Sequence, residues 1–227
     1  MQTKKTIVAL SAGLLLAAPA ALGEGGLDVR VGAFLPDAKG NIFADTQELF
    51  GTKKADWRGV SGGVDFNLGL SSNVELGFGI DAYSRTLDTV YVDFERPSGD
   101  DINQTLKLTV VPLSVSLKVV ANNHRGAVSP YLLAGVDAYF WQYEEDGDFI
   151  DFGSPDLEIG SDFFESTGVA PGFHVGGGVR VPVGDDIKIT AEARYNFAKE
   201  VDMGDDFSRN RIDVSGLAVT VGVNVRF

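Results

Sequence analysis

Only two histidines and no cysteine are available in this chain for acid–base, nucleophilic or metal-binding chemistry. His124 lies between Asn123 and Arg125, in a stretch typical of a solvated turn. His174 could serve as the base of a hydrolase only if a serine nucleophile and an acid lay within hydrogen-bond reach. The next residue on the same face of its strand is Gly176, not serine. The sequence therefore predicts no catalytic residue and no cofactor.

The most acidic segment, residues 142–168, is the one candidate for metal binding. It holds many carboxylates and no basic residue. Calcium binds oxygen ligands, and the residues of this segment that most resemble a calcium ligand set are Asp146, Asp148 and Asp151. Their spacing does not match the defined register of an EF-hand loop. We therefore expect a solvated acidic loop and no metal site.

The N-terminus has the features of an export signal. Two lysines precede an apolar run over residues 7–18, and small residues follow it. The run is shorter than the roughly 20 residues that a membrane-spanning helix needs. We expect residues 1–23 to be a signal peptide, cleaved after Ala20 or Gly23, and residues 24–227 to form one domain.

Composition narrows the class of protein further. The formal net charge is −13, and removing the two lysines of the leader makes the exported part more acidic still. Such a chain, without a basic stripe, is not expected to bind nucleic acid. Without cysteine it has no disulfides and no thiolate metal site. No long apolar run follows the leader, so a membrane-embedded form must cross the bilayer as a closed β-barrel.

The remaining chain alternates apolar and polar residues with a period of two, which is typical of β-strands with two different faces. In one segment Leu106 and Leu108 are out of phase with Leu113, and we interpret residues 110–112 as a β-bulge. Residues 47–54 are expected to form at most a short helix in a loop. The eight alternating segments cover residues 27–35, 60–70, 74–82, 106–119, 132–140, 173–183, 187–197 and 217–227.

The connections between these segments alternate in length. Tight turns are predicted at residues 71–73, 121–127 and 184–186, and long polar loops at 38–56, 86–103, 142–168 and 198–211. A rim of short turns opposite a rim of long loops is the layout of outer-membrane barrels, and soluble barrels need no such asymmetry. The predicted fold is all-β, an eight-stranded antiparallel up-and-down transmembrane β-barrel.

The polar face of the predicted barrel carries charges of both signs in nearly equal numbers. Buried charges must be paired, so this balance suits the inside of a narrow barrel. The charges on this face are Asp28, Asp65, Glu75, Asp81, Asp137, Glu192, Arg30, Arg85, Lys118, Arg180, Lys188, Arg194 and Arg226. The network that we predict in the lumen is centred on Glu192 and Arg194 and comprises Asp28, Arg30, Asp81, Asp137, Arg180, Glu192, Arg194 and Arg226.

Aromatic residues gather near the predicted strand ends, as in the aromatic girdles of membrane barrels. The residues expected in these girdles are Trp57, Tyr139, Phe140, Trp141, Phe173, Tyr195 and Phe197.

Three segments resemble the small outer-membrane β-barrel proteins of the OmpA, OmpX and OmpW type. Residues 219–227, ending on Phe227, look like the terminal strand that the barrel-assembly machinery recognises. Residues 111–135 are similar to the family's central hairpin, and 192–197 to its penultimate strand. The resemblance implies an integral outer-membrane location with long loops outside the cell. It also implies outer-membrane lipid, lipopolysaccharide and the assembly machinery as partners, with Phe227 as the assembly signal.

The resemblance is architectural and implies no activity. We expect a non-enzymatic barrel with a structural or surface-interaction role, whose lumen is plugged by side chains, since eight strands leave an interior just wide enough for side chains to fill. One alternative is a narrow channel for small or hydrophobic solutes, as in OmpW-type barrels. A second is a lipid-A-modifying enzyme with His174 as its base, and a third is a soluble secreted barrel. The sequence names no extracellular ligand.

Overall fold

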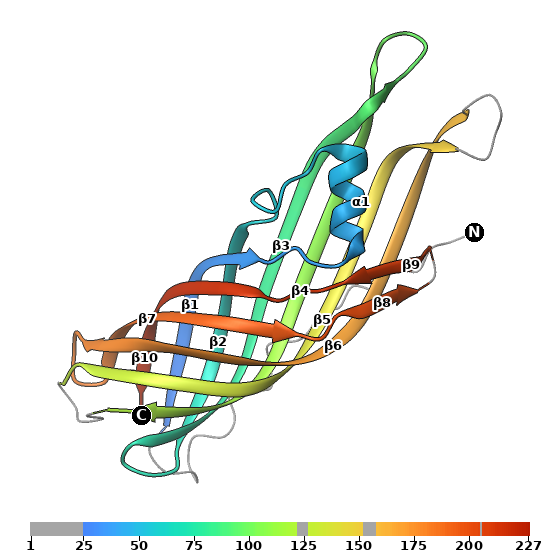
Figure 1. Ribbon diagram of the computed structural model, residues 1–227. Helices are drawn as coiled ribbons and strands as arrows, with labels where there is room; N and C mark the ends of the chain where they lie inside the picture. Colours follow the sequence, from blue (N-terminus) through green and yellow to red (C-terminus); the bar gives the residue numbers. More distant parts are fainter. Residues whose placement is uncertain (1–24, 122–126, 152–157, 205) are drawn as a thin grey trace, which may run out of the picture.

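The computed structural model describes residues 25–121, 127–151, 158–204 and 206–227. In this part of the chain, eight strands form a closed antiparallel barrel in the order β1-β10-β7-β6-β5-β4-β3-β2 (Figure 1). This confirms the predicted fold class. The barrel strands are β1 (Gly25–Pro36), β2 (Gly59–Gly69), β3 (Val74–Glu95), β4 (Asp101–Val120), β5 (Ser129–Asp151), β6 (Glu158–Pro182), β7 (Ile187–Ala198) and β10 (Gly216–Arg226).

The two ends of the barrel differ. At one end, here called the turn end, β2 is joined to β3 and β6 to β7 by short turns, and both Gly25 and Phe227 lie there. The other end, here called the loop end, carries the helix α1 (Asn41–Phe50) and a hairpin of β8 (Val201–Gly204) and β9 (Phe207–Ile212). Figure 1 shows β3, β4, β5 and β6 projecting beyond the other barrel strands, with α1 lying against them.

Three of the predicted long loops are largely strand. The loop predicted at residues 198–211 contains the β8–β9 hairpin, so that prediction was wrong. The prediction of polar loops at residues 86–103 and 142–168 was wrong, because β3 and β4 continue to Glu95 and from Asp101, and β5 and β6 continue to Asp151 and from Glu158. Their backbone groups are paired across most of the extension. The extended strands form a sheet that needs a covering layer on its inner face, and α1 and the β8–β9 hairpin supply it.

The helix α1 begins earlier than predicted and ends at a glycine. Gly51 has a φ of 64°, and its N–H donates to the carbonyl of Gln47 (3.0 Å), which closes the helix with a left-handed cap. Ile42, Phe43 and Phe50 are its buried apolar residues and fix its packed face. No helix among the described residues is long and apolar enough to span a membrane.

The phase change in β4 is not a bulge. The pairing of β4 with β5 keeps one register from Val120↔Tyr131 to Gln104↔Gly147, through the residues at which we predicted the irregularity. Leu108 points inward and is fully buried, whereas Leu117 points outward and is 52% exposed. The strand therefore continues without an inserted residue, and it is the environment around it that changes.

The change of environment falls at one level in the sheet. Ser84, Thr109, Gln142 and Thr167 are paired in that order across β3, β4, β5 and β6, and we call them the boundary row. On the turn-end side of this row, large apolar side chains face outward and are exposed. They include Phe78, Leu113, Val115, Leu117, Val119, Leu132, Val136, Phe140, Val169, Phe173, Val175, Val181, Ile189, Val219, Val221 and Val223.

On the loop-end side of the boundary row most of the large apolar side chains face inward instead, although Val92 and Phe163 face outward. The inward-facing side chains form a buried cluster, here called the loop-end core, which reaches slightly across the row. It includes Phe34, Ile42, Phe43, Phe50, Trp57, Leu87, Tyr91, Ile102, Leu106, Leu108, Tyr143, Ile150, Met203, Phe207, Ile212 and Val214, and, just on the turn-end side of the row, Tyr83, Val110, Tyr139 and Trp141. An apolar outer belt below the row and an apolar interior above it indicate two different surroundings, lipid and water.

This inversion also corrects the predicted girdles. Trp57, Tyr139 and Trp141 are at most 4% exposed and belong to the loop-end core, so their placement at a membrane interface was wrong. These three residues lie near or beyond the level at which water replaces lipid around the barrel. Burial in the interior removes their rings from that water. By contrast, Phe140 and Phe173 face outward and are 44% and 50% exposed.

Candidate functional site

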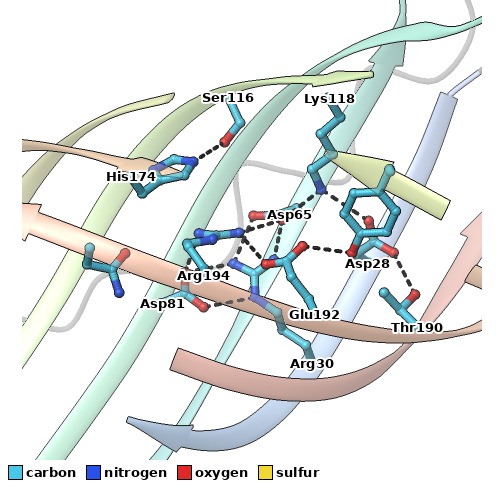
Figure 2. A network of polar contacts seen from close by, with 12 residues as sticks. Asp28, Arg30, Asp65, Asp81, Ser116, Lys118, His174, Thr190, Glu192 and Arg194 are labelled. Carbon is cyan, nitrogen blue, oxygen red and sulfur yellow. Dashed lines mark hydrogen bonds and ion pairs between the residues drawn. The ribbon is translucent and has the colours of Figure 1, made fainter. Parts of the chain in front are cut away.

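The lumen of the barrel contains an ion-pair network whose hub is Asp65 on β2. Three cations from three other strands surround this carboxylate (Figure 2). The Arg30 guanidinium donates to both of its oxygens, the Lys118 ammonium lies 3.1 Å from Oδ2, and a guanidinium nitrogen of Arg194 lies 3.5 Å from it. All four side chains are almost fully buried. The inward, period-two positions of four strands thus place opposite charges in contact.

Toward the loop end the network continues to two more carboxylates. Asp81 accepts from Arg30 at 2.7 Å and from Arg194 at 3.4 Å. Glu192 accepts from Arg194 at 2.9 Å, and the Tyr131 hydroxyl donates to its other oxygen at 2.8 Å. Each buried carboxylate therefore has a charged or hydrogen-bonding partner, as a low-dielectric interior requires.

Toward the turn end the chain of contacts passes through Asp28. Its carboxylate lies 3.5 Å from Lys118 and accepts from Arg180 at 3.0 Å. Arg180 also donates to both oxygens of Glu75, each at 2.9 Å. The network is thus continuous from Asp81 to Glu75.

The structure brings six of the residues predicted for this network into it, namely Asp28, Arg30, Asp81, Arg180, Glu192 and Arg194. Arg226 lines a cavity at the turn end, together with the network residues Glu75 and Arg180, and Asp137 contacts a histidine. Sequence reasoning placed Asp65, Glu75 and Lys118 on the inward face but left them out of the network. Which inward charges meet across a barrel depends on the strand order and stagger.

One inward charge was misplaced. Arg85 was counted among the lumen charges, but it lies beyond the boundary row at the loop end, where it is exposed and donates to the carbonyl of Asp56 at 2.8 Å.

A serine, a histidine and an aspartate lie in hydrogen-bonding sequence inside the barrel. His174 Nε2 is 3.0 Å from the Ser116 hydroxyl, and His174 Nδ1 is 2.8 Å from Asp137 Oδ2 (Figure 2 shows the first contact). Gly135 makes room for the imidazole, because a Cβ there would stand 2.5 Å from its Cε1. Sequence reasoning considered only the histidine's own strand, where position 176 is glycine, whereas Ser116 comes from β4.

This arrangement matches the contacts of a catalytic triad, but its serine and histidine are buried. With Nδ1–H donating to Asp137, Nε2 would accept the proton of the Ser116 hydroxyl. However, Ser116 is 3% and His174 0% exposed, and neither residue lines either of the two cavities described below. In this structure the contacts satisfy a buried imidazole.

Two cavities flank the ion-pair network. The one on its loop-end side has a volume of about 40 Å³ and lies between network residues such as Asp81 and core residues such as Tyr83 and Tyr139. The one at the turn end has a volume of about 190 Å³ and is lined by Arg180, Lys188 and other polar residues. The small cavity leaves little space between the ion-pair network and the loop-end core.

The loop-end core lies above the network. Trp57 lies within it, with its ring 5.4 Å from that of Phe43 on α1 and 6.2 Å from that of Tyr143 on β5. The Tyr83 hydroxyl donates to the carbonyl of Trp57. The segment between α1 and β2 is thereby fastened to the inner face of the extended sheet.

The predicted metal candidates are not gathered into a site. Asp148 pairs with Arg96 and accepts from the Ser161 hydroxyl at 2.7 Å. In the described ranges no group of three histidine, aspartate or glutamate side chains is arranged to hold a metal ion.

Buried Glu145 makes the loop-end core sensitive to pH. It is 8% exposed, and burial raises its pKa above the ordinary value, while the Tyr143 hydroxyl donates to it at 2.8 Å. A carboxyl whose pKa is raised in the folded state binds its proton more tightly there than in the unfolded chain. Folding stability should therefore rise as the pH falls from the raised pKa toward the ordinary value of 4.5.

We expect Glu145→Gln to stabilise the loop end at pH 7 and to remove this part of the pH dependence. Limited proteolysis of the refolded protein between about pH 5 and 8 would measure both effects. Glu144→Gln, on the outward face of the same strand, is the matched control. Equal protection of the Glu145→Gln variant and the parent at pH 7 would contradict the expectation.

The geometry defines a class of protein: a closed antiparallel barrel with an apolar outer belt and charges paired inside is an integral outer-membrane β-barrel. The family comparison agrees. Residues 6–227 match the model of the outer membrane protein beta-barrel domain, and the chain belongs to that family. Comparison with curated proteins gives no match.

Two solved structures show the same fold at low sequence identity, and a third gives a weaker match. The outer membrane protein OprG from Pseudomonas aeruginosa is 11% identical, with a TM-score of 0.53, covering 91% of this chain and 96% of that one. A major outer membrane protein from Thermus thermophilus is also 11% identical with a TM-score of 0.53, covering 89% of this chain and 99% of that one. Neisserial surface protein A is 15% identical, with a TM-score of 0.47 and coverage of 90% and 97%.

The terminal residue completes the wall of the barrel. The backbone N–H and carbonyl of Phe227 pair with Gly25, each at 3.1 Å, and its ring stacks on Phe66 with the centroids 6.1 Å apart. The side chain is 50% exposed. Its role as an assembly signal stays a prediction.

The assignment of the outer belt to lipid makes a direct prediction. Val221 faces outward on β10 and is 58% exposed. Val221→Arg should lower the free energy of unfolding from lipid by about 2 to 4 kcal/mol, the cost of an arginine near the bilayer midplane. Urea titration of the protein in lipid vesicles measures this value.

The matched control is Thr167→Arg, at an outward position of the boundary row, where we expect a change within about 0.5 kcal/mol. Equal unfolding free energies for the Val221→Arg variant and the parent would show that the faces are assigned backwards.

Proposed function

We propose that this protein is a non-enzymatic, plugged barrel that anchors and displays the structured loop end at the cell surface. The proposal rests on two layers of side chains, which are stacked along the barrel. The ion-pair network, from Glu75 to Asp81, occupies the part within the apolar belt. The loop-end core then closes the opening above it.

Little free volume lies between these two layers. The cavity that separates them measures about 40 Å³, which is room for only a few water molecules at about 10 to 15 Å³ each. A hydrated ion would have to displace paired charges and buried aromatic rings to pass. Under this proposal the loop end faces outward, so lipopolysaccharide surrounds the boundary row and extracellular partners meet α1 and the extended strands.

Planar-bilayer recording of the refolded protein tests the proposal. We expect no sustained unitary current, because the ion-pair network and the loop-end core both stand in the path. Asp65→Asn, which removes the hub of the network, serves as the comparison for a weakened plug. Regular open steps from the parent protein, at a frequency that scales with the amount inserted, would refute the plugged lumen.

A second candidate function, lateral passage of small apolar solutes, is supported by an interruption of the barrel wall. Backbone pairing of β3 with β4 is missing between Ile80↔Leu113 and Tyr83↔Val110, although the register is the same on both sides. Pro112 lies in this gap and has no N–H to donate. Ala82 and Pro112 both line the 40 Å³ cavity.

Entry of an apolar fluorescent dye into intact cells that carry lipopolysaccharide would distinguish the two roles. If the gap conducts, cells with the parent protein should take up the dye faster than cells with Pro112→Val, which restores the missing donor. Equal uptake by the two strains, and by cells without the protein, would exclude lateral passage and leave the plugged barrel as the remaining function.

A further inference from the structure

Four basic residues gather at the rim of the barrel where β2 begins. Lys53, Lys54 and Arg58 lie in the segment between α1 and β2, and Arg85 lies on the neighbouring strand β3. A Cβ at Gly59 would stand 3.7 Å from Cδ of Arg85, so this strand lies against the start of β2. All four basic residues are exposed. We call them the rim patch.

The rim patch differs from other basic residues of the loop end in having no carboxylate partner. Arg96 and Lys107 each form an ion pair, with Asp148 and Glu144. Among the described residues, none of the four side chains of the rim patch forms one. Unpaired and exposed cations remain available to an anion from outside the protein.

The carboxylates nearby do not cancel this positive charge. Asp56 lies within the segment, and its Oδ2 accepts from the backbone N–H of Lys53 at 2.7 Å. Asp37 interacts electrostatically with Lys54 but is already paired with Lys39 at 2.7 Å, so this pair adds no net charge.

Two further exposed carboxylates lie on the adjoining elements, Glu48 on α1 and Asp88 on β3. Counting both of them together with Asp56 still leaves an excess of positive charge, in a chain whose formal net charge is −13.

Hydrogen bonds hold the backbone of the rim patch in place. The Tyr83 hydroxyl donates to the carbonyl of Trp57, and Arg85 Nε donates to the carbonyl of Asp56 at 2.8 Å. Within the segment, the N–H of Asp56 donates to the carbonyl of Lys53 at 2.9 Å. The cations therefore project from a folded turn, and a ligand does not first have to order this backbone.

The rim patch begins directly above the apolar belt. Arg58 and Val60 are two residues apart, alternate with buried neighbours, and so share the outward face at the start of β2. Val60 is 72% exposed, and the pair Ser61↔Tyr83 places it beside Ser84 of the boundary row. Arg58 lies about 7 Å beyond Val60, at about 3.4 Å per residue. This is the level at which charged headgroups follow the hydrocarbon of the membrane.

We propose that the rim patch binds the phosphate groups of lipopolysaccharide in the outer leaflet. This assignment rests on the proposed function, which places the loop end outside the cell. A guanidinium such as that of Arg58 can donate two parallel hydrogen bonds to one phosphate, and the lysines add compact positive charges. A membrane lipid fits this position better than a soluble anion does, because its acyl chains would lie against Val60 and the belt below.

Native mass spectrometry of the refolded protein in a zwitterionic detergent tests the binding. Lipid A with both phosphates should be retained on the barrel at low micromolar or lower concentration. Lipid A from which both phosphates have been removed should bind at least about tenfold more weakly, which corresponds to the loss of charge-assisted hydrogen bonds. Equal binding of the two forms, or equal binding of phosphatidylglycerol, would overturn lipopolysaccharide phosphate as the ligand.

Two variants and one control connect the binding to the rim patch. Arg58→Gln and Lys54→Gln remove side chains that make no hydrogen bond or ion pair with a described residue, so the fold should be kept. Each should weaken the binding of phosphorylated lipid A, and the double variant should weaken it at least about tenfold. Lys199→Gln, which removes an exposed lysine after the end of β7, is the matched control and should not change it. Equal affinities of the double variant and the parent, or an equal loss in the control, would overturn the rim patch as the site.

The orientation of the loop end is tested separately. The chain has no cysteine, so Ser98→Cys, in the exposed turn between β3 and β4, gives a single thiol for a membrane-impermeant maleimide. Labelling in intact cells supports an outward loop end. Labelling only after lysis would refute display at the cell surface, and lipopolysaccharide with it. Labelling in intact cells combined with unchanged lipid A binding in the double variant would refute the rim patch alone.

Discussion

Replacing Asp65 with asparagine should cost about 3 to 5 kcal/mol of folding free energy in lipid, the usual penalty for removing one partner of a buried ion pair. The carboxylate meets Arg30, Lys118 and Arg194, and all three cations are at least nine-tenths buried. Asparagine keeps the size of the side chain but cannot balance these charges. Asp81, Glu192 and Asp28 also contact these cations, but the donors that face Asp65 would lose their charged acceptor in a low-dielectric interior.

Urea titration in lipid vesicles measures the loss, with Asp88→Asn as the matched control. Asp88 accepts a hydrogen bond from Thr105 at 3.2 Å, but does so at the exposed surface. We expect that control to change the free energy by less than about 0.5 kcal/mol. If Asp65→Asn is equally mild, water solvates the lumen charges, and a conducting lumen becomes the better interpretation.

The barrel itself could be predicted from the sequence, because successive residues of a strand face lipid and lumen in turn. The two environments favour side chains of opposite polarity. Alternation such as that of residues 113–119 follows from this directly, and it predicted both the strands and the inward charges. The same rule failed at Leu106 and Leu108, because it assumed one environment along the whole strand. Above the boundary row water replaces lipid outside, so a continuous strand buries its other face. Two of the predicted loops were strand for the same reason.

The contacts inside the lumen were harder to predict for a different reason. The alternation of inward and outward positions along each strand is enough to place Ser116, Asp137 and His174 inside the barrel. That they meet depends on β4, β5 and β6 being neighbours at one stagger, as the pairs Ser116↔Gly135 and Gly135↔His174 show. The stagger of eight strands follows from the closed pairing of the whole barrel. The hub at Asp65 escaped prediction in the same way, since its partners are brought together across the lumen.

Among the residues between α1 and β2, one aromatic side chain contributes most to the loop-end core. Trp57 is 1% exposed, its ring packs against Phe43 and Tyr143, and its carbonyl accepts from Tyr83. Trp57→Ala would leave a cavity in the core, and changes of this kind cost about 3 to 5 kcal/mol. The apolar belt and the ion-pair network lie on the other side of the boundary row and should keep the barrel folded.

The expected result is therefore local opening of the loop end in an intact barrel. Trypsin should cleave the Trp57→Ala variant after Lys53 or Lys54, which are exposed and close to the substituted residue, much faster than the parent. Retarded migration on heating in gel electrophoresis would show that the barrel is still closed. Trp57→Phe keeps an aromatic ring in the core and should remain largely protected. Cleavage of parent and Trp57→Ala at the same rate would mean that this segment is already detached, and the loop-end core could not then close the lumen.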